Sequence, residues 1–437
     1  MFERMFDLTA HGTTVRREVV AGATTFLTMA YIMFVNPRIL AGAGMDQSSV
    51  FVATCLATAA TTLLMGLWAK LPVALAPGMG LNAYFAYTVV PQLNYDWRLA
   101  LGCVFAAGIL FVLISISPAR EWLINAIPRS LKLSIAAGIG LFLALIGLTN
   151  AGIVIANPQT ILTVGVLSEP NVLIAAGAFV VIFALAARVV TGAVLIGIVG
   201  ATLVYNWVGL GHIPAIASLS PSIMPTFLQM NLDDPGGAVL APAIFIFLLI
   251  CMLDTSGTLT AVAEEGNLLD NNGKLPNARR ALTTDALGTM IGAALGTSPV
   301  TAYIESASGI QAGGRTGLTA VVVAVLFLLC LFLSPLAAAV PKCATAPALI
   351  FVAVLMVKCL KDINWEDLTE AAPALLTTLA IPFTYSIAAG IGIGFISYVA
   401  IKIIAGRWRD VNFAVFIIAS AFVAKIVIDA YMAKLPL

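Results

Sequence analysis

The chain has 437 residues, of which 61% are hydrophobic and 10% are charged, and its formal net charge is +1. Soluble domains are about 45–50% apolar and about 25% charged. The composition therefore excludes a soluble enzyme, a secreted disulfide scaffold and a disordered chain, and it predicts a protein embedded in a lipid bilayer. Because one spanning helix uses about 20 residues, fourteen spans would use about 280 residues and leave no room for a sizeable soluble domain.

The charge balance and the positions of the cysteines exclude further classes of protein. Lys and Arg number 22 against 21 Asp and Glu, so no basic excess indicates nucleic acid as a partner. The six cysteines lie in or beside apolar runs without paired spacing, which is typical of small residues in a membrane core rather than of a disulfide or zinc framework. They are Cys55, Cys103, Cys251, Cys330, Cys343 and Cys359.

Apolar runs recur from one end of the chain to the other. We find fifteen, at about 19–40, 50–69, 72–90, 99–117, 131–150, 171–187, 191–209, 238–262, 281–296, 299–312, 317–337, 345–360, 371–384, 387–405 and 412–430. Several are too short to span alone. The final run carries Lys425 and Asp429 one helical turn apart, so it either spans the bilayer or lies at its surface.

The distribution of basic residues predicts the orientation. With the N-terminus in the cytoplasm, the outside loops hold only Arg38, Arg98 and Lys342, and the segments 151–170 and 210–237 hold no Lys or Arg. Basic residues concentrate in the cytoplasmic loops of membrane proteins. The pattern predicts fourteen crossings up to about residue 405, with both ends of this unit inside.

Two of the runs, 72–90 and 299–312, are interrupted by Gly and Pro and lie about 220 residues apart, roughly half the chain. Each has a Pro-flanked extended stretch and an Ala-Tyr pair, Ala83-Tyr84 and Ala302-Tyr303, which we expect to open a short helix. Matching interrupted segments in two halves are a sequence signature of a transporter binding site. An offset of seven helices makes the halves inverted. The alternative is that Pro and Gly merely kink two ordinary helices.

Two carboxylates, Asp254 and Glu305, lie inside apolar runs. An acidic side chain at the centre of a bilayer costs about 2.5–3.5 kcal/mol on insertion scales. No basic residue lies in the same runs to form an ion pair, although a partner from elsewhere in the chain is the structural alternative. We therefore predict that the two carboxylates bind substrate, carry a proton, or do both.

Glu305 is expected in the first turn of the short helix that follows Pro299, where free N–H groups and a partial positive charge favour a carboxylate. Asn82 is expected to open the matching helix. Its amide carries a donor and an acceptor that suit the edge of a heterocycle, but capping the helix is an equally good interpretation. Asp285 is interpreted as an N-terminal helix cap.

Hydroxyl groups add two candidates. Thr258 lies one helical turn after Asp254 on the same face, and Thr28 lies in the middle of the first run. Such hydroxyls commonly bond their own backbone instead of a ligand. The two histidines, His11 and His212, lie outside the apolar runs, so neither a metal site nor a proton relay through histidine is predicted inside the membrane. Proton coupling must then use Asp254 and Glu305.

Several stretches resemble the azaguanine-type purine permeases, a branch of the nucleobase–ascorbate and nucleobase–cation symporter group. The resemblance covers essentially the whole chain, and it rests on residues 76–85, 253–258, 280–285, 303–307 and 313–319. It implies an all-α membrane fold of fourteen spans in two inverted seven-helix repeats, with a short strand and a half-helix in spans three and ten. It also implies a core domain of residues 1–117 and 238–337 and a gate domain of residues 118–237 and 338–437.

The resemblance assigns the functional carboxylate of span eight to Asp254 and that of span ten to Glu305. Thr258 stands where uracil- and xanthine-type relatives often have histidine, which disfavours uracil, xanthine and ascorbate as substrates. The stretch from Gly80 to Ala83 is more similar to the guanine/hypoxanthine members than to the adenine-only members. The predicted substrate-binding residues are Glu305, Asp254, Asn82, Gly80, Thr258, Thr28, Tyr303, Ile304 and Phe26.

The predicted function is the proton-coupled import of purine nucleobases, guanine and hypoxanthine first and adenine as a further candidate, across a bacterial inner membrane. Phe26, Tyr84 or Tyr303 could sandwich the purine ring. The expected partners are the purine, the proton and the bilayer, with a homodimer through the gate domain implied by the resemblance and no cofactor. The alternatives are an anion exchanger or channel of the same fold, sodium coupling, and a membrane enzyme, for which no metal cluster or nucleophile–base pair is found.

Overall fold

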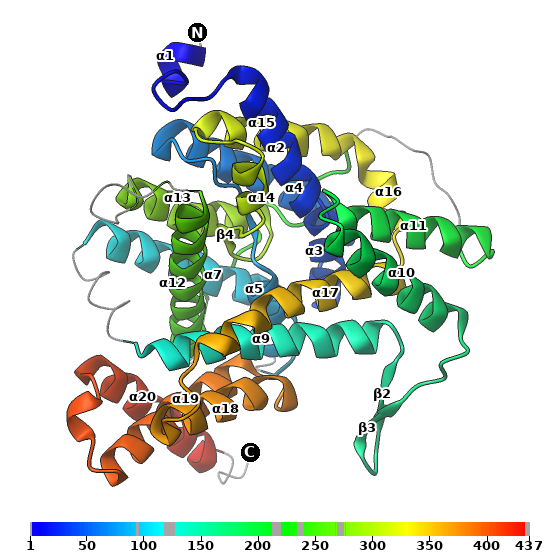
Figure 1. Ribbon diagram of the computed structural model, residues 1–437. Helices are drawn as coiled ribbons and strands as arrows, with labels where there is room; N and C mark the ends of the chain where they lie inside the picture. The colour runs from blue at the N-terminus through cyan, green and yellow to red at the C-terminus, as the bar shows by residue number, and fades with distance from the viewer. Residues whose placement is uncertain are drawn as a thin grey trace. The chain divides into compact units, whose positions relative to one another are not determined.

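The computed structural model describes residues 2–92, 96–117, 127–211, 220–233, 240–266, 268, 275 and 277–432. The described chain is mostly helical (Figure 1). Its α-helices are α1 (Phe2–Phe6), α2 (Val15–Met29), α3 (Ile32–Ala41), α4 (Gln47–Leu64), α5 (Met79–Ala83), α6 (Val90–Gln92), α7 (Trp97–Ile116), α9 (Arg129–Asn150), α10 (Pro170–Ala187), α11 (Ala193–Trp207), α12 (Leu240–Glu265), α13 (Ala278–Leu295), α14 (Ser306–Gln311), α15 (Gly317–Leu329), α16 (Ser334–Ala339), α17 (Lys342–Val357), α18 (Leu368–Phe383), α19 (Ile387–Ile404) and α20 (Phe413–Met432).

The remaining elements are short. The π-helical turns are η1 (Met65–Ala69) and η2 (Tyr84–Val89), and the 3-10 helices are η3 (Cys330–Leu333), η4 (Lys358–Asp362) and η5 (Trp408–Asp410). The strands are β1 (Leu75–Pro77), β2 (Val154–Asn157), β3 (Ile161–Val164) and β4 (Val300–Ala302). Strands β2 and β3 form a hairpin in the segment without Lys or Arg, which the sequence pattern did not predict.

Within the described residues, nine helical segments are long and apolar enough to cross a membrane. Two shorter apolar helices, α11 and α18, the helix α13 and the two interrupted segments around β1 and β4 bring the candidate spans up to Ile404 in the described chain to fourteen. The last of them, α19, ends at Ile404, so the predicted fourteen crossings up to about residue 405 are confirmed. The run 412–430 forms α20.

The first predicted run, 19–40, is one span made of two helices. Helix α2 ends at Met29 and α3 begins at Ile32, with Ala30 and Tyr31 between them. The backbone tightens there, because the N–H groups of Met33 and Phe34 bond three residues back, to Ala30 and Tyr31, at 3.2 and 3.0 Å. The break places the Tyr31 side chain in the interior, where it is 1% exposed.

The two interrupted segments meet as a pair of antiparallel strands. Strand β1 pairs with β4 in the register Leu75↔Ala302, Ala76↔Thr301 and Pro77↔Val300. The Thr62 hydroxyl bonds both the N–H and the C=O of Leu75, at 2.9 and 3.0 Å. Extended chain at membrane depth needs such partners because lipid supplies none. The antiparallel pairing of corresponding segments is what two inverted repeats produce.

One detail of the predicted symmetry is wrong. The Ala-Tyr pairs do not open the short helices, since Ala83 is the last residue of α5 and Ala302 is the last residue of β4. Counted in chain order along the two strands, Leu75, Ala76 and Pro77 correspond to Val300, Thr301 and Ala302, so Ala302 corresponds to Pro77 and not to Ala83. The half-helices open at Met79 and Ser306 instead.

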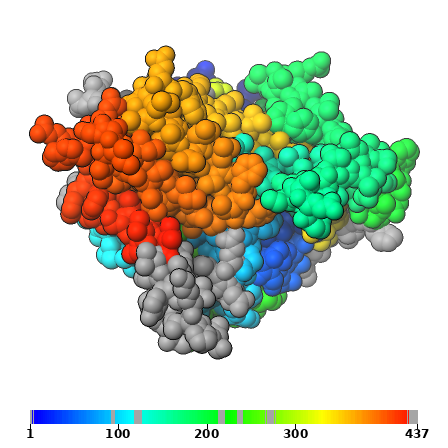
Figure 2. Space-filling model, turned by 90° about the horizontal axis from the view of Figure 1, so that it is seen from below, coloured from blue at the N-terminus to red at the C-terminus, as the bar shows by residue number. Residues whose placement is uncertain are grey.

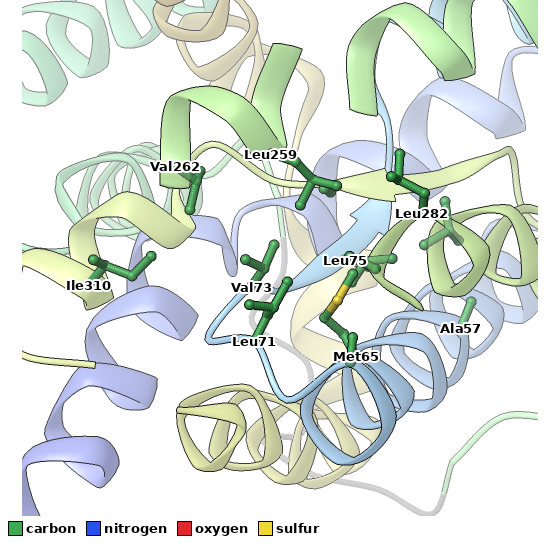
Figure 3. Close-up of a cluster of buried hydrophobic side chains, with 13 residues drawn as sticks. Ala57, Met65, Leu71, Val73, Leu75, Leu259, Val262, Leu282 and Ile310 are labelled. Carbon is green, nitrogen blue, oxygen red and sulfur yellow. The ribbon is translucent and has the colours of Figure 1, made fainter. Parts of the chain in front are cut away.

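A hydrophobic cluster supports the strand pair. Leu71, Val73 and Leu75 lie on one side of the extended segment, as the two-residue period of a strand requires, and they pack with Met65 (Figure 3). Strand β4 itself packs against α12 and α13 (Figure 1), and β1 packs against α4. The cluster is completed by Ala57, Ala69, Leu259, Val262, Ala281, Leu282, Val300, Ala302 and Ile310.

The chain divides into two compact units by its internal contacts. The first comprises Met1–Ser117 and Ile146–Phe351, and the second comprises Pro118–Leu145 and Val352–Leu437. In the first unit, α10 and α11 expose apolar side chains such as Leu173, Val180 and Leu203, as contact with lipid requires; Figure 2 shows part of this surface in teal and green. The division into core and gate domains, which has other boundaries, stays a prediction.

Candidate functional site

The two predicted carboxylates lie on either side of β4 in the first unit. Asp254 belongs to the long helix α12, and its Oδ2 accepts a hydrogen bond of 3.1 Å from the Thr301 hydroxyl of β4. Glu305 is the residue before α14, and its Oε1 accepts a hydrogen bond of 2.6 Å from the Tyr31 hydroxyl. Because Glu305 follows Thr301 by only four residues, the strand end brings the two acids into one region.

Both carboxylates are partly exposed, whereas their donors Tyr31 and Thr301 are each 1% exposed. The donors therefore lie behind the acids, and each carboxyl group keeps one oxygen without a side-chain hydrogen bond among the described residues. Such an oxygen is a strong acceptor that can bind a ligand N–H group. The arrangement suits recognition of a donor-rich polar molecule.

No cation of the described chain neutralises these acids. The ion pairs within 4.0 Å in that part of the molecule join other residues. The structural alternative for Asp254 and Glu305, an ion pair with a distant Lys or Arg, is therefore absent from the described residues.

The threonines take different positions. The Thr28 hydroxyl donates to the backbone oxygen of Thr25 at 2.8 Å and lies 2.9 Å from the Ser308 hydroxyl of α14. It therefore bonds its own helix, as the alternative interpretation held, and also joins α2 to α14. Thr258 is partly exposed one turn beyond Asp254 on α12.

The structure places Asn82 inside α5 and not at its start. The helix begins at Met79, directly after β1, so Asn82 is its fourth residue and its side chain is fully buried. The amide oxygen accepts a hydrogen bond from the Ser298 hydroxyl. Asn82 thus links the two interrupted segments, while Gly80, two residues before it, is partly exposed.

The candidate aromatic residues separate into two groups. Phe26 is partly exposed and packs edge-on against Phe327, with ring centroids 5.2 Å apart. Tyr84 is 1% exposed against Phe247, and Tyr303 is 6% exposed with its hydroxyl donating to the Pro77 oxygen at 2.6 Å. Beside Glu305, Ile304 is 39% exposed. Phe26 and Ile304 are therefore the more accessible of the candidate apolar contacts.

Asp285 is a third buried carboxylate, and its predicted role as a helix cap is wrong. Helix α13 begins at Ala278, so Asp285 lies in its middle and is fully buried. Its Oδ1 accepts from the backbone N–H of Ala302 at 2.8 Å, and its Oδ2 accepts from the Thr255 hydroxyl at 2.5 Å. Asp285 therefore fixes β4 and the residue next to Asp254. The sequence did not predict this role because α13 begins at Ala278, and its charged residues Arg279 and Arg280 lie before the predicted apolar run 281–296.

Glu18 is a further buried acid, which the sequence analysis did not single out. Its carboxylate accepts from the backbone N–H groups of Arg315, Thr316 and Thr319 at 2.9, 3.3 and 3.2 Å. These groups precede or open α15, where a helix leaves its first N–H groups unpaired. Glu18 therefore joins the start of α2 to the turn that precedes α15.

The comparisons with known proteins decide the family. A profile described as the permease family matches residues 16–393. The adenine permease AdeP of Escherichia coli is 50% identical over 432 residues, which cover 99% of this chain and 97% of that protein. The chain belongs to the permease family. The guanine/hypoxanthine permease PbuO of Bacillus subtilis is 43% identical over 432 residues, covering 97% of this chain and 100% of that protein.

The permease also shares its fold with a solved structure. The transmembrane domain of a cyanobacterium bicarbonate transporter, BicA, superposes with a TM-score of 0.65 and 16% sequence identity, covering 86% of this chain and 97% of that domain. The predicted fold is confirmed: a multi-pass membrane protein of inverted repeats with interrupted third and tenth spans. The resemblance to azaguanine-type purine permeases is confirmed by the family match and by the relatives.

Proposed function

We propose that this permease is a proton-coupled symporter that imports purine nucleobases across the cytoplasmic membrane, with its N-terminus in the cytoplasm. The observation that carries the proposal is the pair of partly exposed carboxylates, Asp254 and Glu305, held at the junction of the two interrupted segments without a cation among the described residues. The named substrates of the relatives AdeP and PbuO, adenine and guanine/hypoxanthine, support the purine class.

Purine chemistry fits these acids. An ionised Glu305 accepts one or two N–H groups from the purine, and hydrogen bonds to a charged acceptor are about twice as strong as neutral ones. Asp254 binds another edge or holds the coupled proton. Phe26 and Ile304 offer apolar contact to the ring. The substrate set includes adenine alongside guanine and hypoxanthine, because the identity to AdeP, 50%, exceeds the 43% to PbuO.

The proposed cycle follows from charge. Two ionised acids in a low-dielectric site repel each other. Their charge also makes movement of the site through the membrane costly. Binding of one proton halves the negative charge of the pair, and the N–H groups of a neutral purine satisfy the free carboxylate oxygens. The core domain, residues 1–117 and 238–337, then moves against the gate domain by alternating access. Contacts between the gate domains of a homodimer keep the gate domain in place.

Uptake into proteoliposomes tests the proposal. With an inwardly directed proton gradient in sodium-free buffer, we expect accumulation of radiolabelled adenine or hypoxanthine, abolished by a protonophore. Unlabelled adenine, guanine and hypoxanthine should compete, whereas uracil, xanthine and ascorbate should not. Uptake that needs sodium would overturn the proton coupling. Chloride- or bicarbonate-dependent flux without purine competition would instead indicate an anion exchanger, which two central carboxylates disfavour.

A further inference from the structure

The first turns of the span α2 carry two basic side chains without an acidic partner. Arg16 and Arg17 are exposed. No carboxylate of the described residues lies within 4.0 Å of either guanidinium group, and the described chain provides neither group with a hydrogen-bond acceptor. A pair of adjacent unpaired cations at the edge of a membrane span is available to an anion from outside the chain.

The three acids of the N-terminal segment, Glu3, Asp7 and Glu18, are engaged elsewhere. Glu3 accepts from the backbone N–H of Thr9 at 3.0 Å, and Asp7 pairs with Lys70 at 3.6 Å. Glu18, although it follows Arg17 directly, is fully buried and turned to the backbone that opens α15. The positive charge of the two arginines is therefore not cancelled by the segment that carries them.

These arginines line a cavity. It is an open hollow at the surface of about 370 Å³, lined by Thr14, Arg16, Arg17, Val20 and Ala312, all of which are exposed. One part of the lining is cationic, and another part is apolar. The ligand that matches both parts is an amphiphile with an anionic head.

The position of the two arginines along α2 favours a lipid over a soluble anion as the ligand. Arg17 is the last basic residue before the apolar part of α2, and the side chains that follow, Val19 and Val20, are 44% and 52% exposed. At the end of a membrane span, a guanidinium group one turn before exposed apolar side chains is expected at the level of the phospholipid phosphates. A lipid phosphate reaches this place with its acyl chains already beside the valines, whereas a soluble phosphate gains no apolar contact.

We propose that Arg16 and Arg17, with the cavity that they line beside Ala312, form a binding site for the headgroup of an anionic phospholipid. The site is separate from Asp254 and Glu305, and it does not depend on which substrate the permease carries. A basic residue near an anionic surface contributes about 1 kcal/mol. Loss of both arginines therefore corresponds to about 30-fold weaker binding.

Lipid binding to the delipidated, purified full-length permease tests the site. Native mass spectrometry counts bound phosphatidylglycerol or phosphatidylcholine, and thermal unfolding in detergent gives a second readout. We expect phosphatidylglycerol, but not phosphatidylcholine, to bind and to raise the unfolding midpoint. The double variant Arg16→Ala/Arg17→Ala should lose this effect, and the charge-conserving Arg16→Lys/Arg17→Lys should retain most of it.

The matched control is Arg188→Ala, which removes an exposed arginine at the end of α10 and should bind phosphatidylglycerol like the parent. Equal phosphatidylglycerol binding by the parent and by the double alanine variant would overturn the proposal. So would full competition by millimolar inorganic phosphate, because the ligand would then be a soluble anion. If the double alanine variant fails to fold, the lysine pair decides: binding of phosphatidylcholine as strong as that of phosphatidylglycerol to this folded variant would contradict the proposal.

Discussion

At the scale of single residues, the site depends on how each acid is held. The Tyr31 hydroxyl donates to Glu305 from the break between α2 and α3, and the Thr301 hydroxyl donates to Asp254 from β4. Each donor is buried behind an acid that is partly exposed. The protein thus positions two acceptors without neutralising them, which is what binding a neutral, donor-rich base requires.

The Tyr31–Glu305 hydrogen bond can be removed without changing the size of the side chain. A hydrogen bond to a charged group contributes about 1.5–3 kcal/mol, so Tyr31→Phe should lower the initial rate of purine uptake by about tenfold or more. Uptake assays in cells, normalised to the amount of permease in the membrane, measure this. Tyr205→Phe in α11 is the matched control and should transport normally. A Tyr31→Phe variant as active as the control would show that the hydroxyl does not position Glu305.

The sequence predicted Asp254 and Glu305 because a carboxylate in an apolar run is costly and therefore conspicuous. It misassigned Asp285 because the start of α13 could not be located, and a middle-of-helix acid then resembled a cap. It overlooked Glu18 because its partners, the backbone groups of residues 315–319, lie almost 300 residues away in the chain. An acid inside an apolar run can thus be recognised from the sequence, but its hydrogen-bond partners are known only from the tertiary structure.

At the scale of elements, α14 must approach α2 closely to place Glu305. Gly309 makes this approach possible, since a Cβ atom there would lie 2.0 Å from the Thr25 Oγ1 and 2.6 Å from the Ala21 oxygen. Overpacking of this kind costs about 1–3 kcal/mol. The position of the half-helix α14 therefore depends on Gly309, which the sequence analysis did not identify as important.

We expect Gly309→Ala to push α14 away from α2, to lower the thermal unfolding midpoint and to reduce purine uptake. Gly200→Ala in α11 is the control, because a Cβ atom there meets no other atom within 4 Å. Both variants gain the same methyl group in a helix. Equal stability and equal uptake of the two variants would contradict the close packing of α14 on α2.

In the second unit, a buried ion pair joins α18 and α19. The Lys402 Nζ lies 2.7 Å from the Glu370 Oε1, and Lys402 is 3% exposed. Ser130 and Tyr398 also donate to Glu370. The Lys402 Nζ also lies 3.7 Å from the Asp410 Oδ2, and the Glu370 side chain is 23% exposed. Removing one partner of a fully buried pair costs about 3–5 kcal/mol, and Asp410 offsets part of this cost here, whereas replacing both partners by apolar residues can be neutral.

Glu370→Gln should therefore destabilise the permease strongly, and the double variant Glu370→Leu/Lys402→Met should recover much of the loss. Thermal unfolding in detergent measures both variants, with the exposed Glu366→Gln as the control. A double variant that is no more stable than Glu370→Gln would show that the pair contributes through something other than mutual charge compensation.

At the scale of the whole molecule, the fold was predictable because periodic features fix it. The apolar runs and basic loops gave fourteen spans ending near residue 405, and α19 ends at Ile404. The interrupted segments were recognisable from Gly and Pro, but their pairing in the register Ala76↔Thr301 was not, because an Ala-Tyr repeat suggested other counterparts. The β2–β3 hairpin was missed because only long apolar runs were considered as elements, although Asn157-Pro158 is a turn signal between the two β-branched stretches.

The central claim is that Glu305 and Asp254 bind the purine and carry the coupling. The most direct measurement is the initial rate of proton-driven uptake of radiolabelled adenine and hypoxanthine by Glu305→Gln, which removes the charge and keeps the shape. Glu169→Gln, at an exposed residue before α10, is the matched control. We expect uptake by Glu305→Gln to be abolished while Glu169→Gln transports like the parent. Parental uptake rates in a normally inserted Glu305→Gln variant would contradict the account.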